Sequence, residues 1–132
     1  MVYDFEWRGD FDNASLNKLH AEAFGHRLLD HDWKRQAQEH SLGWVCAYEG
    51  GELVGFVNLA WDGSVHAFLL DTVVAKRALR RGVGRDLVAH AVAGARAAGC
   101  EWVHVDFHDH LRPFYLDACG FSATSAGVIC LR

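Results

Sequence analysis

Residues 69–88 read LLDTVVAKRALRRGVGRDLV, and this stretch decides the fold of the chain. A β-branched run ends at Val74, a basic loop follows, and an amphipathic helix begins near Gly84. The pattern predicts a strand that leads into a helix N-terminus, where unpaired N–H groups and the helix dipole favour an anion. Gly82 and Gly84 let the backbone approach a ligand closely. Basic side chains surround the same loop: Lys76, Arg77, Arg80, Arg81 and Arg85.

The length, composition and net charge of the whole chain limit the class of protein. The chain has 132 residues, 51% of them hydrophobic, which fits a single domain over residues 1–132 with one core. Its apolar stretches fall short of the ~20 residues of a membrane span, and its start does not resemble a signal peptide. Four cysteines without a Cys-x-x-Cys pair predict reduced thiols and a cytoplasmic protein. A formal net charge of −4 argues against nucleic acid as a partner, and makes the basic loop indicative of a polyphosphate ligand.

Periodicity and turn residues predict the order of elements. Strands are expected at residues 2–8, 44–48, 53–61, 65–74 and 101–107, with two short strands within 121–131. Helices are expected at residues 12–24, 30–40, 84–98 and 110–118. The crossover through helix 84–98 places strand 101–107 parallel to strand 65–74. The order β-αα-βββ-α-β-α-ββ predicts an α/β (α+β) fold, a mixed central sheet with helices on both faces.

The strand–loop–helix resembles the acyl-CoA-binding motif of the GNAT superfamily of N-acetyltransferases, in which Gln/Arg-x-x-Gly-x-Gly/Ala follows a strand ending in Val. Val74 ends the strand here, Gly82 and Gly84 take the glycine positions, and Leu79 stands at the Gln/Arg position. Residues 112–121, RPFYLDACGF, are similar to the family's late Phe-Tyr…Gly-Phe segment. The resemblance implies the GNAT fold, in which two parallel strands splay apart and the acyl-CoA thioester reaches into the gap.

The resemblance also implies a reaction and a cofactor site. In the implied reaction, a primary amine attacks acetyl-CoA directly in a ternary complex. The amine belongs to a small molecule or a peptide. Backbone groups of Thr72, Val73 and Val74 would pair with the pantetheine arm. The loop amides would hold the pyrophosphate, at Leu79, Arg80, Arg81, Gly82, Val83, Gly84 and Arg85. His108 stands where many family members carry an Asn that contacts the cofactor.

Four residues are candidates for proton transfer. Tyr115 resembles the family's general acid, but it stands five residues before Gly120 where the family usually has four. Either the late helix holds an extra residue or Tyr115 points elsewhere. His110 opens this helix on the side of the expected thiol and is a candidate relay.

Asp71 is the third candidate, because a carboxylate inside an apolar run is costly unless it is paired. It could bind the substrate ammonium or act as the base, or it could be a structural residue bonded to nearby backbone. His66 is an alternative base. It lies on the opposite face of the strand from Asp71 unless a bulge intervenes.

Two other functions remain open. His104, Asp106 and His108 would share one face of strand 101–107, which is a donor set for Zn²⁺ or Fe²⁺ and allows a small metalloenzyme using the His104–His110 cluster. The departures at Leu79 and Tyr115 allow a catalytically degenerate module that only binds acyl-CoA. We favour the acetyltransferase and assign no metal ligand.

The last expectations concern the surface. Four histidines of the N-terminal helical region are expected to be surface residues: His20, His26, His31 and His40. The apolar segment 127–131 could pair between chains in a homodimer.

Overall fold

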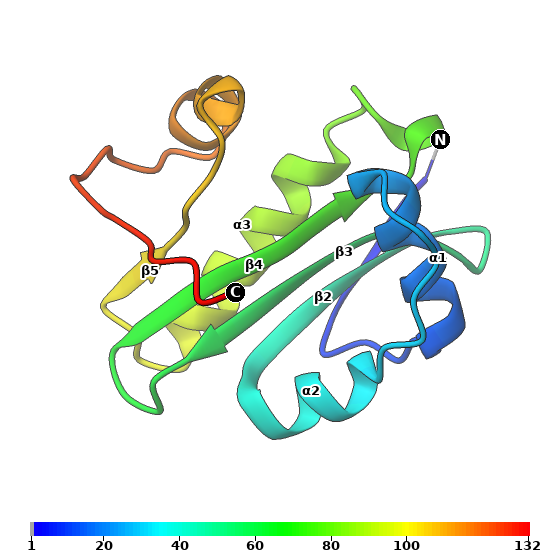
Figure 1. Ribbon diagram of the computed structural model, residues 1–132, viewed down its shortest axis with the longest axis horizontal. Coiled ribbons are helices and arrows are strands. Elements are labelled where there is room, and N and C mark those ends of the chain that lie inside the picture. The colour runs from blue at the N-terminus through cyan, green and yellow to red at the C-terminus, as the bar shows by residue number, and fades with distance from the viewer. Residues whose placement is uncertain (1) are drawn as a thin grey trace.

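The protein is built around a five-stranded sheet with the strand order β1-β2-β3-β4-β5, as the computed structural model shows for residues 2–132 (Figure 1). The antiparallel strands are β1 (Asp4–Trp7), β2 (Ser41–Glu49), β3 (Glu52–Trp61) and β4 (His66–Val74). β5 (Trp102–His104) pairs with β4 in parallel. The predicted mixed sheet and parallel crossover are therefore confirmed.

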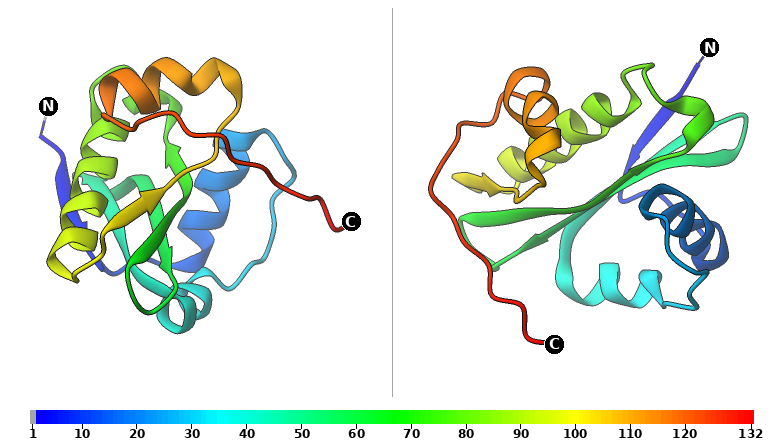
Figure 2. Two further views of the ribbon diagram at one scale, coloured as in Figure 1. Left: turned by 90° about the vertical axis from the view of Figure 1, so that its left-hand side faces the viewer. Right: turned by 45° about the horizontal axis from the view of Figure 1, so that its top comes forward.

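Helices cover both faces of this sheet, as predicted (Figure 2). α1 (Asn13–Phe24) and α2 (Trp33–His40) lie on one face, and α3 (Val83–Ala97) lies on the other. Three short helical segments complete the chain: η1 (Lys76–Ala78), η2 (Asp109–Leu111) and η3 (Pro113–Ala118).

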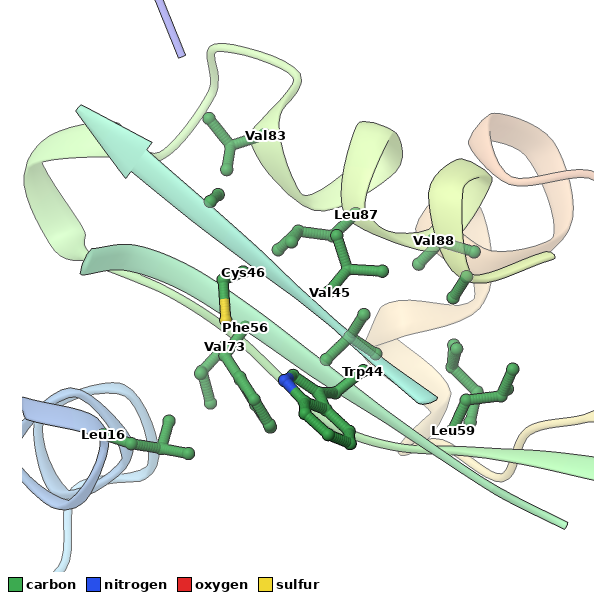
Figure 3. Packing of buried hydrophobic residues seen from close by; sticks show 14 of the residues in the cluster. Leu16, Trp44, Val45, Cys46, Phe56, Leu59, Val73, Val83, Leu87 and Val88 are labelled. Carbon is green, nitrogen blue, oxygen red and sulfur yellow. The ribbon is translucent and has the colours of Figure 1, made fainter. Parts of the chain in front are cut away.

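Apolar side chains fill both spaces between sheet and helices. Leu87 and Val88 of α3 point toward Val45 of β2 (Figure 3). On the other face, Phe56 lies edge-on to Phe11, with ring centroids 5.3 Å apart. Burial from both sides explains why β2 and β3 read as nearly continuous apolar runs rather than alternating ones.

Local sequence sets the ends of the N-terminal helices. The Ser15 N–H donates to Asp12 Oδ1 at 2.7 Å and caps α1, and Gly25 ends that helix with φ 67°. The Arg35 N–H donates to Asp32 Oδ1 at 3.1 Å. Because Asp32 is the cap, α2 begins at Trp33 instead of the predicted residue 30.

The two short strands predicted within 121–131 are wrong. Residues 119–132 form no strand in the described chain, and the tail runs as an extended segment past β5 (Figure 1). Residues 122–127, SATSAG, are mostly small residues with weak strand preference. The apolar residues that follow are exposed, Ile129 by 85%.

The contact between β3 and α3 is tight enough to test the fold. A Cβ at Gly55 would lie 2.9 Å from Leu87 Cδ1 and 3.2 Å from the Cβ of Ala47. We expect Gly55→Ala to lower the free energy of unfolding by ~1–3 kcal/mol through overpacking. Leu87→Ala should lower it by ~2–5 kcal/mol through the cavity it leaves.

Urea unfolding of the double variant tests this contact. The added methyl group fills part of the cavity, so the double variant should lose less stability than the sum of the single losses. Leu28→Ala, at an exposed leucine, is the control and should change stability by less than ~0.5 kcal/mol. Strictly additive losses would show that Gly55 and Leu87 do not share one space.

Candidate functional site

A bulge in β4 determines where Asp71 points. The register of β3 against β4 shifts beside Asn58, so Asp71 and Thr72 together face the single residue Val57. Asp71 has φ 56°, in the left-handed region that Asp tolerates better than most residues and that costs ~1–3 kcal/mol. Its carboxylate turns toward α1, where Oδ1 lies 3.1 Å from His20 Nε2. Asp71 is thus paired with a side chain rather than with neighbouring backbone.

The second half of β4 has an open edge. β5 pairs only with residues 66–68 of β4, and the chain beyond His104 leaves the sheet (Figure 1). The Ala75 N–H donates to Val54 O of β3 at 2.7 Å. Because backbone groups alternate along a strand, those of Val73 also face β3, whereas those of Thr72 and Val74 face the open edge. Of the three residues predicted to pair with pantetheine, Thr72 and Val74 have the required orientation.

The predicted phosphate loop runs from this edge into α3. Gly82 is the N-cap with φ 80°, and no side chain caps the helix. A Cβ at Gly84 would lie 3.3 Å from the Phe114 ring and 3.6 Å from Val74 Cγ2. The first turn of α3 therefore presents bare backbone between the end of β4 and Phe114, which suits the close approach of an anion.

The side chains of the loop differ in their surroundings. Leu79 is 52% exposed, Arg80 has φ 63°, and Val83 is buried in the core. Arg81 is exposed, and Arg85 lies 3.7 Å from Asp86. Arg77 is turned away from the loop. It pairs with Glu49 and Glu52, at 3.4 and 2.9 Å.

Tyr115 lies in an aromatic cluster beside the bulge. Its ring stacks on Phe107 with centroids 5.0 Å apart and meets Phe114 edge-on at 4.8 Å. Burial raises the pKa of the Tyr115 phenol, and a hydrogen bond with the Thr72 side chain partly opposes this shift. The phenol is therefore protonated near neutral pH and reaches β4 at the start of its open edge.

The geometry of η3 explains the unusual spacing of Tyr115. η3 is a π-helical segment in which the Cys119 N–H donates to Phe114 O, five residues earlier, at 3.0 Å. A π-turn accommodates one extra residue within a helix. Of the two sequence alternatives, the extra residue is the one observed.

The late histidines do not form the predicted shared face. β5 ends at His104, so Asp106 and His108 are not on a strand with it. His104 Nε2 lies 2.8 Å from His66 Nδ1 instead. His108 and His110 are exposed on either side of the start of η2, with their rings 6.0 Å apart, and their assigned roles stay predictions. Within residues 2–132, no group of three His, Cys, Asp or Glu side chains is placed to hold a metal ion.

Comparison with known proteins decides the family. The model of the acetyltransferase (GNAT) family matches residues 6–121. The chain belongs to the GNAT acetyltransferase family. This membership confirms the predicted family and the assignment as an acyltransferase. No curated protein sequence matches the chain.

Solved structures share the GNAT fold at low sequence identity. A probable acetyltransferase from Staphylococcus aureus is 17% identical, with 99% of each chain covered and a TM-score of 0.80. Glucosamine-6-phosphate N-acetyltransferase from Arabidopsis thaliana is 17% identical, with 98% of each chain covered and a TM-score of 0.73. An aminoglycoside N-acetyltransferase in complex with CoA is 20% identical over 99% of this chain and 95% of its own, with a TM-score of 0.75.

The sequence did not predict the contacts that two histidines of this GNAT protein make with each other and with Asp71. His20 and His26 were expected at the surface, but the side chain of His20 is only 16% exposed and bonds to both Asp71 and His26. A signal was present, because His20 lies four residues after the buried Leu16 and thus on the same face of α1. None of the helices within residues 2–132 has the length and apolarity needed to cross a membrane.

Proposed function

We propose that this GNAT protein transfers the acetyl group of acetyl-CoA to a primary amine by direct attack in a ternary complex. One observation carries the proposal. The open edge of β4 at Thr72 and Val74 lies between the bare first turn of α3 and the protonated phenol of Tyr115. These groups supply what an acyl-CoA thioester requires: strand pairing for pantetheine, amides for the pyrophosphate, and an acid for the leaving sulfur.

The proposed reaction follows from this arrangement. The amine nitrogen attacks the thioester carbon, and a backbone N–H at the open edge of β4 stabilises the oxyanion. The C–S bond then breaks, and the sulfur takes the proton of Tyr115, which recovers one from the acylated nitrogen. The acceptor enters as an ammonium, so a second proton must first pass to a base, which we assign to Asp71.

The protonation of the Cys119 thiol, beside the late aromatic cluster, favours direct attack over a cysteine intermediate. Burial raises the pKa of Cys119, and the charge of Arg85 opposes this only in part. The thiol is therefore protonated near neutral pH and is a weak nucleophile. An acetyl-cysteine intermediate at Cys119 is disfavoured.

The acceptor class is supported by the names of similar structures. One acts on an aminoglycoside and another on glucosamine 6-phosphate, both as N-acetyltransferases. We infer an amine on a small molecule as the first class to test, with a peptide N-terminus as the second.

Titration calorimetry with acetyl-CoA tests the proposal, with dephospho-CoA as a matched ligand and a chelator control. We expect micromolar binding that the chelator does not change. A thiol-release assay should then detect CoA with at least one amine among kanamycin, glucosamine 6-phosphate, spermidine and a short peptide. Binding without release for any amine would identify a degenerate acyl-CoA module, and absence of binding would overturn the cofactor site.

Two further properties belong to the proposal. We infer a reducing, cytoplasmic compartment from the four free cysteines, Cys46, Cys100, Cys119 and Cys130. We also infer a homodimer in which the exposed segment 127–131 pairs with a second copy. Sedimentation velocity tests the dimer, and a monomer at micromolar concentration would overturn it.

A further inference from the structure

Three side chains form a continuous line from the β4 bulge to the loop after α1. Asp71 Oδ1 lies 3.1 Å from His20 Nε2. His20 Nδ1 lies 2.7 Å from His26 Nε2. His26 Nδ1 lies 2.7 Å from the carbonyl oxygen of Arg27. We call Asp71, His20 and His26 the relay.

Counting protons shows what the relay can do. Its two ends, a carboxylate and a peptide carbonyl, are both acceptors, so each of the three short distances needs a hydrogen between its atoms. Two neutral imidazoles bring only two hydrogens, because each carries one. All three hydrogen bonds form only when the relay holds one further proton. The observed geometry is therefore that of a relay that holds one extra proton and can share it along the line.

The surroundings hold the relay in place and limit competing charges. The His20 ring packs against Trp33 and Phe24, with centroids 5.0 and 4.5 Å away. Among residues 2–132, the titratable groups that contact the His20 ring are Asp71 and His26. Asp71, with its left-handed backbone, is the end of the relay that lies next to the open edge of β4.

We propose that the relay removes the proton of the acceptor ammonium at Asp71 and delivers it through His20 to the surface at His26. This inference rests on the proposed acetyl transfer. The N–H bond of the ammonium breaks and its proton joins Asp71, while a proton already in the relay leaves His26 for solvent. The acceptor nitrogen keeps its electron pair and attacks the thioester. His20 and His26 are positioning residues that act through Asp71.

His26→Gln tests the relay, because an amide can hydrogen-bond in the same place but cannot pass a proton. With the amine of highest turnover, we expect kcat to fall about 10- to 100-fold, while the Kd for acetyl-CoA is unchanged. Imidazole buffer should restore part of the rate and shift the pH profile toward that of the wild type. Asp71→Asn, which suits the same backbone conformation, should cost at least as much and should not be restored. His40→Gln, at an exposed histidine on α2, is the matched control.

Nitrogen NMR of the imidazoles gives a readout that does not depend on turnover. In the wild type, the ring nitrogens of His20 and His26 should show the chemical shifts of imidazoles that are hydrogen-bonded to each other, and His26→Gln should change those of His20. Wild-type kcat in His26→Gln, or nitrogen chemical shifts of His20 that do not respond to His26→Gln, would overturn the relay alone. Failure of the wild type to release CoA with any amine would overturn the proposed function and, with it, this role of the relay.

Discussion

Gly84→Glu should lower the affinity for acetyl-CoA at least about 100-fold, which corresponds to about 2.7 kcal/mol. The Cβ of the added side chain would lie 3.3 Å from Phe114 and 3.6 Å from Val74. The longer side chain would add bulk between β4 and η3, and its carboxylate would compete for the amides that we assign to the pyrophosphate. A negative charge there also repels the anion that the helix N-terminus attracts.

The same substitution should leave the fold intact, which makes the result interpretable. A glutamate in the first turn of α3 interacts favourably with the helix dipole, by ~0.3–1 kcal/mol. This gain offsets part of the crowding against Phe114, which is half-buried and can shift. The urea midpoint should therefore move little while acetyl-CoA binding is lost.

Gly84→Gln separates charge from bulk, and calorimetry measures both variants. Glutamine has the same size, so it should weaken binding less than glutamate does. Equal losses would assign the effect to shape alone. Unchanged affinity in Gly84→Glu would remove the loop from the cofactor site and leave the strand–loop–helix as scaffold.

Local patterns determined how much of this structure the sequence could predict. The β4–loop–α3 segment was predictable because a β-branched run, two glycines and a helical apolar stripe follow one another without interruption. The parallel pairing of β5 followed from the handedness of the crossover. Its early end at His104 did not, because alternation continues in the sequence to Phe107 while the chain leaves the sheet.

The residues that we assign to proton transfer were predictable only in part. Tyr115 was found from its motif, and its five-residue spacing from Gly120 contained the information that a π-turn is present. His20 and Asp71 are 51 residues apart, and their contact depends on a bulge and a left-handed backbone that no local pattern shows. A pairing between a helix and a distant strand is decided by tertiary packing.

Tyr115→Phe should lower kcat about 100-fold or more while changing the Kd for acetyl-CoA by less than about threefold. The phenylalanine ring keeps the stacking on Phe107 and removes only the hydroxyl beside Thr72. Without that hydroxyl the departing sulfur has no acid within the aromatic cluster. Binding is retained because the backbone of β4 and the first turn of α3 are untouched.

The pH dependence and a matched control make this test specific. Burial raises the pKa of Tyr115, so the phenol stays protonated to a higher pH than a free tyrosine, whose pKa is about 10. The alkaline loss of kcat that belongs to Tyr115 should therefore lie above that value and vanish in the variant. Tyr3→Phe, which removes a buried hydroxyl without a hydrogen-bond partner in the described chain, should leave kcat unchanged. A wild-type rate in Tyr115→Phe would mean that solvent protonates the sulfur, and that the aromatic cluster only packs beside the open edge of β4.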